Sequence, residues 1–138
     1  MPDTPLGSAA NGAGETDPPT AVVVDDQKGL AELLAERLSM DGFQASVATS
    51  AKDALALCAQ QDFDVAFIDL KLPDMNGLTA ARQMRKLSAA LKIILVTGFA
   101  VSVDDQEVGS ADINGVLPKP WRPAELEAIL KTIGRRQP

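Results

Sequence analysis

Hydrophobic and polar positions follow two different periods along this chain, and from residue 21 onward segments with one period alternate with segments with the other. Short apolar or alternating runs, which are typical of β-strands, are separated by longer stretches in which leucine and alanine recur at helical spacing. Strands are predicted at residues 21–26, 43–48, 64–69, 92–97 and 115–117. Helices are predicted at residues 28–42, 51–60, 78–87 and 123–133. The pattern therefore predicts five strands that alternate with helices.

The residues at the ends of the predicted helices support these boundaries. Gly42 follows the first helix, and Ser50 precedes the second with Asp53 three residues later, as in a capping box. Pro123 stands in or just before the first turn of the last helix. The segment at residues 98–114 differs, because its valines, paired acids and glycine are poor helix formers. We expect only a short or mobile helix there.

Strands that alternate with helices imply a parallel sheet with helices on both faces. The connections are right-handed, so the carboxyl ends of all the strands meet at one edge, where open α/β sheets bind ligands. We interpret Cys58 and the clustered leucines of the first helix as core, and not as a cofactor site. These leucines are Leu30, Leu33, Leu34 and Leu38.

Composition narrows the class of protein. The 138 residues, of which 46% are hydrophobic, correspond to one domain with a single core. We expect a disordered leader at residues 1–20, rich in Pro, Gly, Ala and Thr, then a folded domain at residues 21–133 and a tail at residues 134–138. No apolar run is long enough to span a membrane, no signal peptide is visible, and the single cysteine excludes an internal disulfide. A cytoplasmic location is therefore expected.

Charge and histidine content exclude further classes of function. The net charge is −6 and no basic stripe is present, which disfavours direct binding to nucleic acid. The chain contains no histidine. This absence excludes Ser-His-Asp and Cys-His nucleophile systems, histidine-bound zinc, and a phosphohistidine formed on this chain.

Polar side chains stand at the carboxyl ends of four predicted strands. The residues are Asp25 and Asp26 after the first strand, Asp69 after the third, Thr97 after the fourth and Lys119 after the fifth. Each alone has an ordinary explanation, such as a helix cap, a turn or a solvated lysine. Together they bring three carboxylates, a hydroxyl and an ammonium to one edge of the sheet. We therefore expect a functional site at this edge.

Electrostatic repulsion predicts a cation at this site. Two carboxylates about 4 Å apart repel by roughly 4 kcal/mol at an effective dielectric constant near 20. An incomplete set of oxygen ligands suits Mg²⁺, which keeps several waters and is often shared with a phosphate. One carboxylate can then act as a nucleophile toward phosphorus and form an acyl phosphate. Lys119 and Mg²⁺ would neutralise the transferring phosphoryl group, and Thr97 would donate a hydrogen bond to it.

Four motifs connect these residues to a known family. The motifs "VVVDD", "FIDLKLPDMNG", "LVTG" and "LPKPW" occur in this order between residues 21 and 133. In them the chain resembles the receiver domain of the two-component response-regulator family. The resemblance implies a flavodoxin-like, doubly wound α/β fold with five parallel strands in the order 2-1-3-4-5. It also implies a phosphorylation-controlled switch that takes a phosphoryl group from a histidine kinase or phosphotransfer protein and controls a downstream protein.

The resemblance also assigns roles to the residues at the sheet edge. It makes Asp69 the phosphoacceptor, Thr97 the switch hydroxyl and Lys119 the residue that senses the phosphoryl group. The implied Mg²⁺ ligands are Asp25, Asp26, Asp69 and the backbone carbonyl of Lys71. A domain of this kind catalyses its own phosphorylation and slow dephosphorylation, and it is not an enzyme that acts on a separate substrate.

Val116 departs from the family pattern, in which a tyrosine or phenylalanine often stands three residues before the lysine as a rotameric switch. We expect the signal to pass instead through a rearrangement of residues 98–114. Gly98 either leaves room for a bulky phosphodonor or serves turn geometry. The resemblance further suggests a cis peptide bond between Lys119 and Pro120.

Two other classes of function remain open at this point. A hydrolase of the haloacid-dehalogenase kind also uses a strand-end aspartate and Mg²⁺, but it needs a second aspartate where this chain has Lys71. A binding module that works without phosphorylation usually lacks an acidic residue or the lysine, whereas this chain keeps them all and departs only at Val116. The side chain of Lys71 is either solvated or tunes dephosphorylation.

Overall fold

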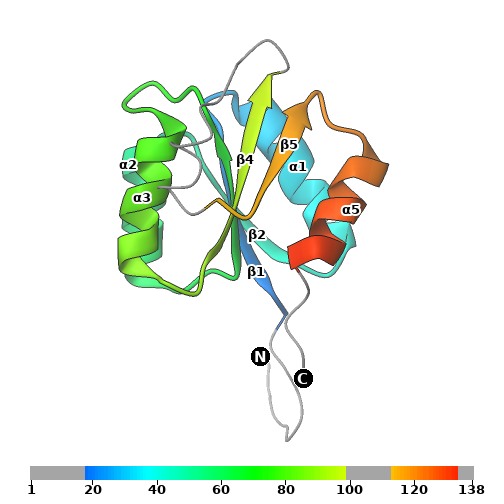
Figure 1. Ribbon diagram of the computed structural model, residues 1–138, viewed down its shortest axis with the longest axis horizontal. Coiled ribbons are helices and arrows are strands. Elements are labelled where there is room, and N and C mark those ends of the chain that lie inside the picture. Colours follow the sequence, from blue (N-terminus) through cyan, green and yellow to red (C-terminus); the bar gives the residue numbers. More distant parts are fainter. Residues whose placement is uncertain (1–17, 99–112, 134–138) are drawn as a thin grey trace, which may run out of the picture.

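The computed structural model describes residues 18–98 and 113–133, which build a parallel sheet between two layers of helices (Figure 1). The sheet has five strands in the order β2-β1-β3-β4-β5, which confirms the predicted topology. The strands are β1 (Thr20–Val24), β2 (Gln44–Ala48), β3 (Val65–Asp69), β4 (Lys92–Gly98) and β5 (Gly115–Lys119). The helices are α1 (Lys28–Met40), α2 (Ala51–Gln60), α3 (Gly77–Leu87) and α5 (Pro123–Ile133).

The two faces of the sheet carry separate hydrophobic cores. Because side chains alternate along a strand, Val22 and Val24 of β1 point to one face, and Ala21 and Val23 point to the other. The first face packs against α2 and α3, and the second packs against α1 and α5, as Figure 1 shows. The central strands are therefore apolar on both faces, and polar side chains are left for the strand ends.

Strand boundaries differ from the prediction at both ends of the chain. β1 ends at Val24, so Asp25 and Asp26 begin the connection to α1 and are not part of the strand. β5 continues two residues beyond the predicted end at residue 117, because its last two residues pair with the end of β4. Lys119 is thereby held by the sheet itself. The bond between Lys119 and Pro120 is cis, as expected.

The leucines of α1 do not all belong to the core. Leu34 and Leu38 are buried, but Leu30 and Leu33 are 42% and 54% exposed, so the interpretation of all four as core is wrong for these two. The reason is geometric: a helix on one face of a sheet buries a single stripe, which here consists of Ala31, Leu34 and Leu38. Leu30 and Leu33 lie beside that stripe.

Three predicted features lie outside the described residues. The disordered leader falls almost entirely on residues 1–17, the fourth helix on residues 99–112 and the tail on residues 134–138. Within residues 18–98 and 113–133, the helices are all too short or too polar to cross a membrane.

Cys58 is half-buried and packs against the core beneath α2 and α3, and burial raises the pKa of its thiol to about 11. Because the thiolate is the reactive form, alkylation by iodoacetamide at pH 8 should be about a hundredfold slower in the folded protein than in urea. The rate in the folded protein should keep rising with pH up to about pH 11. A rate that levels off near pH 9 would contradict this prediction.

Candidate functional site

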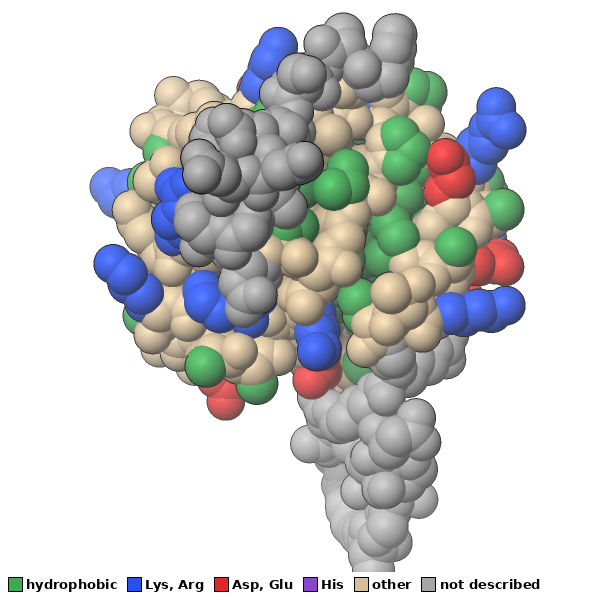
Figure 2. Space-filling model, viewed as in Figure 1, with side chains coloured by type: hydrophobic (Ala, Val, Ile, Leu, Met, Phe, Trp, Pro, Cys, Tyr) green, Lys and Arg blue, Asp and Glu red, His purple; other side chains and the backbone are tan. Residues whose placement is uncertain are grey.

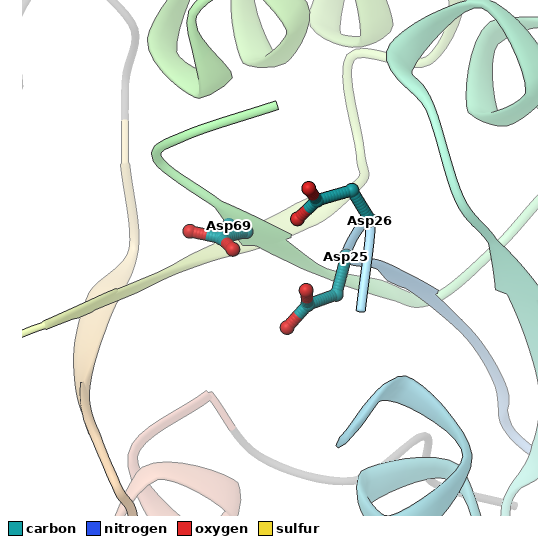
Figure 3. Close-up of side chains that lie close together, drawn as sticks. All are labelled: Asp25, Asp26 and Asp69. Carbon is teal, nitrogen blue, oxygen red and sulfur yellow. The ribbon is translucent and has the colours of Figure 1, made fainter. Parts of the chain in front are cut away.

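Three carboxylates meet at the carboxyl edge of the sheet. β1 and β3 are neighbouring strands, so Asp25 and Asp26, which follow β1, lie beside Asp69, the last residue of β3. Each residue offers one carboxylate oxygen, and these oxygens lie within 4.8 Å of one another (Figure 3). Asp25 and Asp69 are buried, and Asp26 is exposed. The cluster is thus closed from below by the sheet and open to solvent at Asp26.

Lys119 joins the two buried carboxylates. Its Nζ donates to Oδ2 of Asp25 at 2.8 Å and to Oδ2 of Asp69 at 3.0 Å. Burial alone would lower the pKa of Lys119, but the hydrogen bonds and charges of the two aspartates outweigh burial and raise the pKa above its ordinary value. The ammonium therefore stays charged at neutral pH. Within residues 18–98 and 113–133, one cation contacts the cluster of three carboxylates, so the formal charge of these four side chains is about −2.

Backbone N–H groups fix the other oxygens of the two buried carboxylates. Oδ1 of Asp25 accepts from the N–H of Gln27 at 2.9 Å, and Oδ1 of Asp69 accepts from the N–H of Lys71 at 3.1 Å. Asp25 therefore also serves the turn that leads into α1, but it does not cap the helix, because Gln27 is the N-cap and α1 has no side-chain cap hydrogen bond. Both carboxylates are held at both oxygens, which sets their orientation before any ligand binds.

The donor set fits Mg²⁺. The described groups are all oxygen ligands, the cluster keeps excess negative charge, and one of its members faces solvent. Mg²⁺ binds through one or two carboxylates and keeps several waters, so a partly open cluster of this kind suits it. Asp25, Asp26 and Asp69 are the described groups that would hold the ion, and the family resemblance adds the backbone carbonyl of Lys71 in the adjacent loop.

Thr97 is buried near the end of β4, and its hydroxyl donates weakly to the carbonyl oxygen of Gly98 at 3.3 Å. Gly98 pairs with Lys119 inside the sheet, and a Cβ added there would meet nothing within 4 Å among the described residues. It is therefore the last residue of β4. Val116 lies opposite Leu95 and is 46% exposed. Figure 2 shows exposed hydrophobic side chains on the side of the molecule where β5 and α5 lie.

An apolar groove runs from the cluster along α1. Its volume is about 540 Å³, and its walls are the exposed leucines of α1 on one side and Pro120 and Trp121 on the other. Asp25 and Lys119 line the same groove, so it is continuous with the acidic cluster. The sequence pattern assigned Leu30 and Leu33 to the core, and only the rotation of α1 on the sheet reveals them as groove walls.

Gly77 is a site residue that the sequence analysis did not single out. It begins α3, and its N–H donates to the carbonyl of Leu70 at 2.8 Å. A Cβ at this position would collide with the backbone oxygen of Asp69 and lie 2.8 Å from Cα of Leu70. Asn76 caps α3 by accepting from the N–H of Leu78 at 2.7 Å. The sequence signal for Gly77 was the "NG" pair at the end of "LPDMNG".

Comparison with known proteins agrees with this geometry. The family model described as the response regulator receiver domain matches residues 21–131. A receiver domain structure from Methylobacillus flagellatus shares 36% identity at a TM-score of 0.77, with 84% of this chain and 98% of that one covered. The response regulator protein TrrA from Thermotoga maritima, solved in complex with Mg²⁺-BeF, shares 28% identity at a TM-score of 0.73, with coverage of 84% and 99%.

A curated relative points to the same family. The response regulator MprA from Mycolicibacterium vanbaalenii is 32% identical over 120 residues, which cover 86% of this chain and 52% of MprA. The chain therefore spans about half the length of this relative. With the family model and the sheet topology in agreement, the chain belongs to the response regulator receiver domain family.

Substitution of Gly77 by alanine tests the close contact with the end of β3. We expect Gly77→Ala to lower the free energy of unfolding by about 1–3 kcal/mol, because the backbone around Asp69 must shift to admit the methyl group. Gly29→Ala in α1 is the control, since a Cβ there meets nothing within 4 Å and should raise stability by up to about 1 kcal/mol. Equal urea midpoints for the two variants would contradict the steric argument.

Proposed function

We propose that this domain is a phosphorylation-controlled switch in which Asp69 accepts a phosphoryl group. The observation that carries the proposal is the position of Lys119 Nζ, which lies between Asp25 and Asp69 at 2.8 and 3.0 Å. An ammonium held by two carboxylates at the ligand edge of a parallel sheet is placed to stabilise the charge of a transferring phosphoryl group. The family match supports the same function.

In the proposed reaction, a carboxylate oxygen of Asp69 attacks the phosphorus of a phosphohistidine on the donor protein. The new P–O bond forms as the P–N bond breaks, and its electron pair stays on the imidazole nitrogen of the donor. Lys119 neutralises the phosphoryl oxygens, and the hydroxyl of Thr97 donates a hydrogen bond to one of them. When bound at the cluster, Mg²⁺ would supply the remaining positive charge. Attack by water on the acyl phosphate returns Asp69 and releases phosphate.

The proposed signal leaves the site through Thr97. Its present bond to the carbonyl of Gly98 is long, at 3.3 Å, so the hydroxyl can exchange that acceptor for a phosphoryl oxygen at little cost. Thr97 and Gly98 lead directly into residues 99–112, and Val116 offers no ring that could rotate in response. We therefore assign the output to the segment after Gly98, acting on a downstream protein.

The proposed switch is distinct from a hydrolase that acts on a separate substrate. The residue two positions after Asp69 is Lys71, whose side chain is exposed, so this position supplies no carboxylic acid for protonating a leaving group. The site also disfavours a module that works without phosphorylation, because the three carboxylates and the lysine are all present and close together. The carboxylate oxygens lie within 4.8 Å of one another, and Lys119 donates hydrogen bonds to Asp25 and Asp69.

Phosphoryl uptake tests the proposed function directly. Incubation with acetyl phosphate and Mg²⁺ should add the mass of one phosphoryl group to the wild-type protein, as measured by intact mass spectrometry. Asp69→Asn should remain unmodified, because an amide is not a nucleophile toward phosphorus. Removal of Mg²⁺ with a chelator should also abolish the adduct. If the wild type remains unmodified and does not bind the phosphoryl mimic beryllofluoride, the proposal is wrong.

The apolar groove is the surface on which we propose that the phosphodonor protein docks. It begins at Asp25 and Lys119, and its exposed leucines would be covered by an apolar helix face on the donor. A donor bound there would stand next to Asp69, which its phosphohistidine must reach. The argument rests on the continuity of groove and cluster.

A negative charge placed in the groove should slow phosphoryl transfer from a protein donor but not from a small-molecule donor. We expect Leu33→Asp to slow phosphoryl transfer from a histidine phosphotransfer domain that phosphorylates the wild type by about tenfold or more, while the rate with acetyl phosphate is unchanged. Leu87→Asp is the matched control, since Leu87 is similarly exposed at the end of α3 and lies outside the groove. Equal transfer rates for the two variants would contradict docking in the groove.

A further inference from the structure

We propose that Asp74 is a positioning residue for the Mg²⁺ site, because it ties the loop between β3 and α3 to the N-terminus of α2. The inference rests on the proposed function and on the backbone carbonyl of Lys71, in this loop, being a ligand of the ion, as the family resemblance implies. Asp74 does not touch the carboxylate cluster. It acts through the path of the backbone between Asp69 and Gly77.

Asp74 contacts the N-terminus of α2 through both of its carboxylate oxygens. Oδ1 of Asp74 accepts from the N–H of Ala51 at 3.0 Å, and Oδ2 accepts from the N–H of Lys52 at 2.9 Å. These two hydrogen bonds lower the pKa of Asp74, although the side chain is exposed. The positive end of the helix dipole favours a carboxylate at this place. Both oxygens are used, so the carboxylate and the backbone that carries it are fixed relative to α2.

The cap of α2 shows that Asp74 is not needed merely to begin the helix. Ser50 is the N-cap, and its Oγ accepts from the N–H of Asp53 at 3.1 Å. The N–H of Ala54 donates to the carbonyl of Ser50 at 3.1 Å. The start of α2 therefore already has a local cap. Asp74 adds two further acceptors, and it lies 23 residues after Ala51 and 22 residues after Lys52 in the chain.

At the start of the loop, the N–H of Leu70 donates to the carbonyl of Val96 on β4 at 3.0 Å, and the other polar contacts beyond it are local. The N–H of Lys71 donates to Asp69, Lys71 forms an isolated bridge with Asn76, and Asn76 caps α3. These contacts close the loop on itself but do not place its tip relative to the rest of the sheet edge. Asp74 supplies that connection. A carbonyl ligand gains affinity for a metal when surrounding contacts hold it in place, and loss of such outer contacts weakens metal binding.

The test compares Asp74→Ala with Ser50→Ala, which removes a cap of the same helix and leaves the loop contact intact. We expect both variants to lower the urea midpoint. Only Asp74→Ala should weaken Mg²⁺ binding, by about tenfold in the dissociation constant measured by calorimetry. Asp74→Asn keeps one acceptor oxygen and should bind Mg²⁺ with intermediate affinity. The phosphoryl adduct from acetyl phosphate should then require correspondingly more Mg²⁺ in Asp74→Ala.

The outcomes separate this inference from the proposed function. If the wild type binds Mg²⁺ and takes up phosphoryl but Asp74→Ala binds Mg²⁺ equally well, the positioning role is wrong and the proposed function stands. If Ser50→Ala loses as much Mg²⁺ affinity as Asp74→Ala, the effect belongs to the stability of α2, and the positioning role is again wrong. If the wild type binds no Mg²⁺ and takes up no phosphoryl, both proposals fail together.

Discussion

Repulsion among three carboxylates is the constraint on which the rest of this structure depends. Asp25, Asp26 and Asp69 hold oxygens within 4.8 Å of one another, two of them in buried side chains, and a single ammonium stands among them. Such a cluster is stable only where the backbone holds it firmly and a cation balances it. The parallel sheet meets the first requirement, because β1 and β3 pair directly and stop beside each other. Lys119 meets the second in part, which leaves room for a divalent ion.

The position of Lys119 depends in turn on the outer edge of the sheet. β5 pairs with β4 up to the pair of Gly98 and Lys119, so the backbone of the lysine is held by the sheet next to the cluster. From there its side chain crosses to carboxylates on β3 and after β1, 50 and 94 residues earlier in the chain. The same hydrogen bonds raise its pKa and keep it charged. The charge that would meet an incoming phosphoryl group is therefore maintained by the residues that the group would approach.

The loop after Asp69 connects the cluster to the helices on the other face of the sheet. Gly77 allows α3 to begin in contact with the backbone of Asp69, and Asp74 connects the loop to the start of α2. On the opposite face, α1 and the segment after β5 form an apolar groove that ends at Asp25 and Lys119. The cluster thus lies between a rigid loop on one side and an open groove on the other.

Several properties of this protein were determined by the sequence alone. The alternation of two hydrophobic periods determines the order of strands and helices, because each period is compatible with one kind of backbone. The carboxyl ends of parallel strands share an edge, so Asp25, Asp69 and Lys119 were expected at the same edge of the sheet once the strands were recognised. The strand-end motifs then indicated the family. None of these steps requires knowledge of how a particular side chain is rotated.

Only the tertiary structure decided which groups touch. The exposure of Leu30 and Leu33 depends on the rotation of α1 on the sheet, and a run of leucines at mixed helical spacings is compatible with more than one rotation. The contacts of Gly77 with Asp69 and of Asp74 with α2 depend on the path of one loop, which local sequence preferences do not determine. The bridge made by Lys119 needs four strands, β1, β3, β4 and β5, in register at once. Periodicity along a chain specifies elements and edges, whereas contacts between distant residues follow from how those elements pack.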